Sequence, residues 1–137
     1  MKAVKRRHDW RARLQSYLAS VAREPFEYGR HDCALFAAGA VQAMTGSDLA
    51  RGFRGYRTEK GGIKKLRKKG YDDQFAFLEA TLREIPPAFA KVGDVAVVPS
   101  DEGPALGIVQ GEWIHVLRRE GIANMPRLSA TRAFEVS

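Results

Sequence analysis

Apolar residues recur at helical spacing in the first part of the chain and at strand spacing in the last part. The first helical face consists of Trp10, Leu14, Tyr17, Leu18 and Val21. This pattern predicts a basic N-terminal helix over about residues 9–22, with Asp9 as its N-cap. The next run, 33–44, is apolar on nearly all sides and predicts a central buried helix that begins after Asp32 and ends at Gly46.

Two more helices and a sheet complete the predicted order. Thr58 is suited to cap a helix that continues to Lys69, and a fourth helix is predicted from Asp73 to about Glu84, before Pro86. Strand patterns then follow at 95–98, 105–110, 112–117, 121–125 and 131–136. Helices first and an antiparallel sheet second, over about 94–136, predict one α+β domain that spans residues 1–137.

Length and composition fit this picture. The chain has 137 residues, the size of one typical domain. No stretch approaches the ~20 apolar residues that a membrane span needs. The N-terminal residues are basic but have no apolar run behind them, so we expect no secretion signal and synthesis in a cytoplasm.

Positive charge is concentrated in two segments. Six of the first 13 residues are Lys or Arg, and residues 51–69 hold nine basic residues against Glu59 alone. The candidate binding surface consists of Arg51, Arg54, Arg57, Lys64 and Lys68. We interpret it first as a solvated or partner-binding surface, second as a site for an anionic cell-envelope polymer and third as a nucleic-acid site, because no nucleic-acid recognition motif accompanies it.

One cysteine and three histidines limit the available chemistry. A single cysteine excludes an internal disulfide, and no histidine pairing predicts a metal site or a cofactor. Cys33 nevertheless lies at the predicted start of a helix, where the free N–H groups favour a thiolate. It is therefore the candidate nucleophile, although a small buried apolar residue is the alternative interpretation.

Several short motifs occur in the order found in a known class of hydrolases. They are Tyr28-Gly29, Asp32-Cys33-Ala34-Leu35-Phe36, Gly93-Asp94-Val95, Ala105-Leu106-Gly107-Ile108 and Trp113-Ile114-His115. This series resembles the NlpC-type bacterial cell-wall cysteine peptidases. The resemblance implies a papain-like fold with Cys33 as nucleophile, His115 as the third, orienting residue and Tyr28 near the thiolate.

The chain departs from that family at the general base. The resemblance assigns the base position to Ala105, which cannot take the thiol proton. Because general acid–base help contributes about 10²–10⁴ in rate, we expect hydrolysis to be lost or weakened. Two substitutes remain open: His31, two residues before Cys33, or His115 in direct contact with the thiol.

The pattern extends beyond these motifs to Thr45-Gly46, Arg54-Gly55-Tyr56, Gly121-Ile122 and Thr131-Arg132-Ala133-Phe134-Glu135-Val136. Over nearly its whole length the sequence is thus also similar to an uncharacterised family encoded among the tail genes of long-tailed phages, prophages and gene transfer agents. This resemblance implies a tail-tip (baseplate) component, made in the bacterial host cytoplasm, with other tail-tip or hub proteins and peptidoglycan as partners. The alternatives are an active cysteine peptidase or amidase on peptidoglycan stem peptides and a basic nucleic-acid-binding accessory protein.

Overall fold

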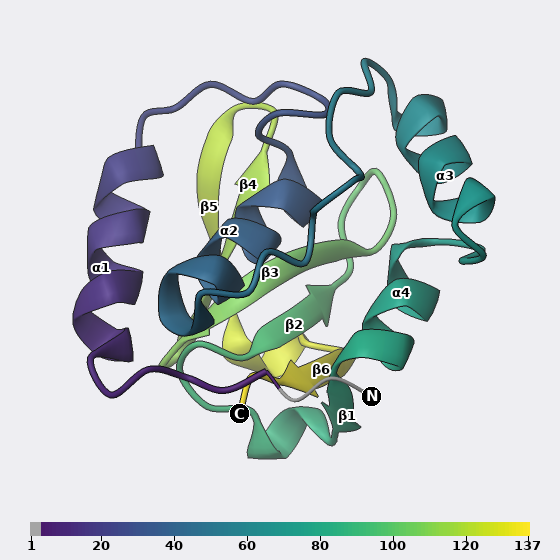
Figure 1. Cartoon of the computed structure of the whole chain (residues 1–137). Helices are drawn as coiled ribbons and strands as arrows, with labels where there is room; N and C mark the ends of the chain where they lie inside the picture. The colour runs from purple at the N-terminus through teal and green to yellow at the C-terminus, as the bar shows by residue number, and fades with distance from the viewer. Residues whose placement is uncertain (1–3) are drawn as a thin grey trace.

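The computed structural model describes residues 4–137, and Lys2 of the basic N-terminal segment lies outside the described residues. It is an α+β structure (Figure 1). The helices are α1 (Trp10–Val21), α2 (Cys33–Thr45), α3 (Glu59–Lys68) and α4 (Gln74–Thr81). The strands are β1 (Arg83–Ile85), β2 (Val95–Val98), β3 (Ala105–Gln110), β4 (Trp113–Arg118), β5 (Gly121–Pro126) and β6 (Arg132–Glu135), with short 3₁₀ turns at Pro87–Phe89 and Arg127–Ser129.

The central helix begins and ends as its sequence predicts. The Asp32 carboxylate accepts a hydrogen bond from the Leu35 N–H at 3.0 Å, and Gly46 ends α2 in the left-handed conformation, with φ of 83°. The Asp9 prediction is wrong in one respect. Its side chain makes no capping bond to α1, because it pairs instead with Arg13 at 2.8 Å.

The third and fourth helices bury fewer of their residues than α2 does. Thr58 caps α3 as predicted, through the Gly61 N–H at 3.0 Å, but α3 has no fully buried residue. The fourth helix ends at Thr81, earlier than predicted, because the next residues form β1 and pair with β6. In Figure 1, α3 and α4 lie on one side of α2 and α1 lies on the other.

The six strands form one antiparallel sheet in the order β1-β6-β2-β3-β4-β5. Its register pairs Val97 with Leu106 between β2 and β3, and Ile108 with His115 between β3 and β4. Alternation along the strands divides their side chains between two clusters. Leu106 belongs to the cluster that includes the α2 residues, whereas Val109 belongs to a smaller cluster on the other face.

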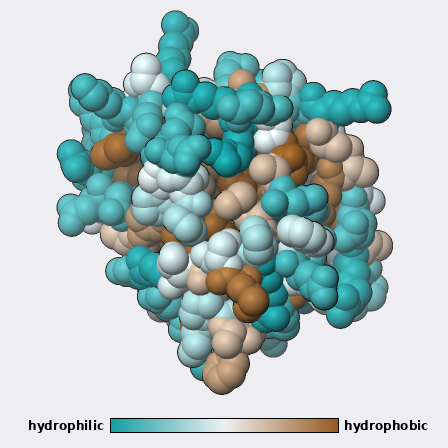
Figure 2. Space-filling model, turned by 180° about the vertical axis from the view of Figure 1, so that it is seen from behind, coloured by the Kyte–Doolittle hydropathy of each residue, from teal (hydrophilic) through white to brown (hydrophobic). Residues whose placement is uncertain are grey.

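Few large apolar side chains remain exposed. Phe89, Trp113 and Leu128 are the exposed large hydrophobic residues in the part that the structure describes. Seen from behind, the surface is largely hydrophilic, with hydrophobic residues in small areas between hydrophilic ones (Figure 2). Isolated apolar residues of this kind are ordinary on protein surfaces.

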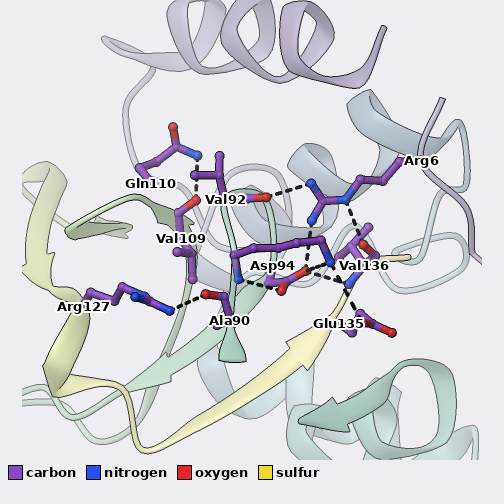
Figure 3. Close-up of polar contacts among 10 residues, drawn as sticks. Arg6, Ala90, Val92, Asp94, Val109, Gln110, Arg127, Glu135 and Val136 are labelled. Atoms are coloured by element: carbon purple, nitrogen blue, oxygen red, sulfur yellow. Dashed lines mark hydrogen bonds and ion pairs between the residues drawn. The ribbon is translucent and has the colours of Figure 1, made fainter. Parts of the chain in front are cut away.

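A buried ion pair fastens the N-terminal segment to the sheet (Figure 3). Arg6 donates to the Asp94 carboxylate at 2.9 Å, and its guanidinium also donates to the carbonyl oxygens of Val92 and Val136 at 2.7 and 2.8 Å. Asp94 is fully buried and accepts the Val136 N–H at 3.0 Å and the Lys91 N–H at 2.9 Å. The Gly-Asp motif before β2 thus has a structural role here.

Candidate functional site

Cys33 is the first residue of α2 and faces β3. Its sulfur lies close enough to the Leu106 backbone for a hydrogen bond that stabilises the thiolate. The helix is held at this place by its apolar residues, since Phe36, Ala40, Val41 and Met44 are completely buried. The predicted position of Cys33, at the start of a buried helix and against the 105–117 hairpin, is confirmed.

The loop before Cys33 is fixed by Asp32, which is buried. One carboxylate oxygen caps α2, and the other accepts the Gly29 N–H at 3.1 Å and the Tyr56 hydroxyl. Gly29 has a positive φ of 77°, and a Cβ there would lie 1.9 Å from the Tyr56 carbonyl oxygen. Glycine is therefore required at this position, and Asp32 serves as a cap, as predicted.

The electrostatics around the thiol oppose its ionisation. Burial is the largest effect and raises the pKa of Cys33, while the Leu106 backbone lowers it and the neighbouring Asp32 carboxylate raises it. Burial also raises the pKa of Tyr56 strongly, and the hydrogen bond to Asp32 raises it further. At neutral pH the site therefore contains a neutral thiol beside a neutral phenol.

On β3, the residue beside Cys33 is Leu106. It directly follows Ala105, to which the resemblance assigns the position of the general base. Ala105 packs with the cluster on the other face of the sheet, although it also lines the cavity that contains Cys33, whereas Leu106 is buried with the α2 residues. Continuing the register of Ile108 with His115 places Leu106 opposite Leu117. Two leucines, Leu106 and Leu117, thus line the cavity that contains the thiol.

Neither substitute histidine pairs with the thiol among the described hydrogen bonds. His115 lies two strand positions from Leu117, and its Nδ1 hydrogen-bonds to Asn124 Oδ1 at 2.6 Å. His31 is buried, 4% exposed, and its ring meets Phe36 edge to face at 6.4 Å between centroids. Its Nε2 has no hydrogen-bond partner among the described residues, and burial lowers its pKa.

Tyr28 does reach the site, because it lines the same cavity as Cys33. Its hydroxyl accepts a hydrogen bond from Arg119 at 3.0 Å, and Arg119 also pairs with Glu102 at 3.2 Å. Tyr56 and Arg119 are not among the predicted site residues. The Gly55-Tyr56 dipeptide was the available signal for Tyr56, but its partner in the loop before Cys33 is distant in sequence.

The basic stretch separates into one structural arginine and several free cations. Arg54 binds the Asp48 carboxylate through two nitrogens, at 2.9 and 3.1 Å, which holds the loop before α3. Arg51, Arg57, Lys64 and Lys68 are exposed, and none makes a salt bridge within residues 4–137. These four residues form the cationic surface.

The described residues contain no helix that is long and apolar enough to cross a membrane. Within the same range, no group of three His, Cys, Asp or Glu side chains is placed to hold a metal ion. The described residues thus form an α+β structure with a partly buried thiol and no base hydrogen-bonded to it.

The chain belongs to the DUF6950 family, described as a domain of unknown function, whose model matches residues 5–136. No curated protein matches the chain.

Proposed function

We propose that this protein is a tail-tip component of a long-tailed phage or phage-like particle, built on an NlpC-like, papain-like fold whose hydrolytic activity is lost or strongly weakened. The observation that carries the loss of activity is the surroundings of Cys33. The thiol begins the central helix and faces the sheet, as a nucleophile of this class should, but Leu106 occupies the neighbouring strand position.

The chemical consequence is a missing proton acceptor. Attack by sulfur on an amide requires a thiolate, and departure of the amine requires a proton donor. Burial keeps the thiol protonated, and His115 is engaged with Asn124 instead. Since no imidazole pairs with Cys33 in the described chain, both proton transfers lack a group to perform them.

Peptidoglycan cleavage tests this part of the proposal. The purified chain is incubated with defined muropeptides, and the products are measured by mass spectrometry beside a Cys33→Ser variant. We expect no release of stem-peptide fragments by either protein. Cleavage by the wild type that disappears in Cys33→Ser would replace the proposal with an active peptidase or amidase.

The cationic surface supports a docking role in the assembly. Its four cations are exposed and unpaired within the described residues, so a partner's carboxylates can bind them without first breaking an internal ion pair. Virion localisation and hub partners follow from the resemblance and remain part of the proposal.

Complementation of a tail-gene deletion tests the assembly role. An Arg57→Ala/Lys64→Ala double variant should fold but fail to restore infective particles, judged by plaque titre and electron microscopy of tails. An Arg23→Ala/Lys5→Ala variant removes the same charge from exposed positions elsewhere and should complement normally. Equal complementation by both variants would contradict docking through this surface.

A further inference from the structure

A cavity of about 360 Å³ lies between α2, α3 and α4, with Cys33 in its wall. Ile63 and Leu66 of α3 line it, as do Phe53 and Phe77, whose rings meet edge to face at 5.2 Å. All four side chains are only partly buried. The apolar side chains around this cavity therefore face inward but are not fully packed.

Small residues keep the cavity open. Ala34 and Ala38, one helical turn apart on α2, both line it and are only partly buried. Elsewhere on α2, larger residues such as Phe36 and Met44 fill the core completely. A larger side chain at Ala34 or Ala38 would project into the space, so the cavity depends on alanine at these two positions.

The cavity wall has little unbalanced charge. The Asp32 carboxylate is already bound by the Gly29 and Leu35 N–H groups and the Tyr56 hydroxyl. The Cys33 thiol is neutral, since burial disfavours its anion. At the rim, Glu102 is paired with Arg119, whereas the exposed Glu59 at the start of α3 makes no ion pair within the described residues. Inside this rim, a charged ligand would lose hydration without gaining a free counter-charge.

We infer that this cavity is a binding site for a small, neutral, largely apolar molecule with an aromatic or alkyl body. Its size falls at the lower end of the range for ligand sites, and its aromatic and aliphatic wall with a few polar groups is typical of them. This inference is independent of the proposed tail-tip role, because the isolated chain should bind the ligand.

The neutral fluorophore N-phenyl-1-naphthylamine tests the site directly. We expect a saturable rise in its fluorescence with one site per chain, and displacement by 1-dodecanol. Ala38→Leu, which fills the cavity, should weaken the probe's Kd by about tenfold or more, since steric exclusion outweighs the gain of one added alkyl group. Ala19→Leu, the same change at an exposed position of α1, should leave Kd unchanged.

Two further measurements distinguish loss of ligand binding from loss of folding. Urea unfolding should show that Ala38→Leu is folded. If that variant does not fold, Ala34→Leu replaces it in the binding experiment. The bound probe should also slow iodoacetamide alkylation of Cys33 by severalfold, because the thiol is in the wall of the site. Absence of saturable binding by the wild type, or binding that both filled variants retain, would overturn the inference.

Discussion

The Cys33 sulfur lies against the Leu106 backbone, and the Leu106 side chain is buried on the same face of the sheet as α2. On β3, a base for the thiol would come from position 106, because the side chain at 105 packs with the cluster on the opposite face.

Leu106→His should therefore bring an imidazole to the thiol, whereas Ala105→His should not. Imidazolium formation next to sulfur stabilises the thiolate, so the pKa of Cys33 should fall in the first variant. The measurement is the pH dependence of iodoacetamide alkylation. A shift to lower pH in Ala105→His alone would mean that the strand faces are assigned incorrectly.

In the wild type, alkylation at neutral pH should be slow in the folded chain and fast in urea. Burial raises the pKa of Cys33 above that of a free thiol, about 8.5, and so removes the reactive anion. The comparison uses mass spectrometry of the modified chain with time. A native rate that equals or exceeds the unfolded rate would show a thiol that is still poised for reaction.

Tyr56→Phe should destabilise the fold by about 1–3 kcal/mol, because it leaves the buried Asp32 carboxylate with one hydrogen bond fewer. Urea unfolding measures this free energy. Tyr71→Phe removes a hydroxyl with no hydrogen bond among the described residues and should change stability by much less. Similar losses in the two variants would contradict a specific role for the Tyr56 hydroxyl.

Arg6→Ala should cost about 3–5 kcal/mol, since it leaves the buried Asp94 with only the more distant and exposed Lys91, at 3.9 Å, as a cation. The matched variant Arg13→Ala breaks the exposed pair with Asp9 and should cost much less, because solvent screens this pair. Both values come from urea unfolding. A small loss in Arg6→Ala would mean that Lys91 and the backbone N–H groups are enough to stabilise the Asp94 carboxylate.

Stability should decrease as pH falls below about 6.5, partly through His31. Burial lowers the pKa of His31 in the folded chain, partly offset by Glu24 and Asp32, so the unfolded chain binds the proton more readily. Its contribution is present above the unfolded pKa and is lost as pH falls through the folded pKa. His31→Phe should flatten the dependence of the unfolding free energy between pH 7 and 5, while His8→Gln, at an exposed position, should not.

Sequence patterns predicted most of the fold because its helices and strands carry clear caps and periodicity. Asp32, Thr58 and Gly46 act where their residue types favour them. The three residues of β1 were missed because their strand character depends on pairing with β6, about 50 positions away. The fourth helix was correspondingly predicted too long.

The candidate site was predictable only in part. The position of Cys33 follows from a local signal, namely an N-cap before an apolar helix. The β3 residue beside Cys33 depends on which face of that strand packs against α2. A shift of one residue along β3 exchanges Ala105 for Leu106 at this place. His115 lies on the strand that follows β3, but the pairing of β4 with β5 places it opposite Asn124, to which it hydrogen-bonds.

The contacts of Arg6 also have a kinetic consequence. They join positions 88 and 130 residues apart, so we expect loop closure to make them late events in folding. Contacts that are absent from the transition state act on the unfolding rate and leave the folding rate nearly unchanged. We therefore expect the Arg6–Asp94 pair to affect the lifetime of the native state more than the rate of folding.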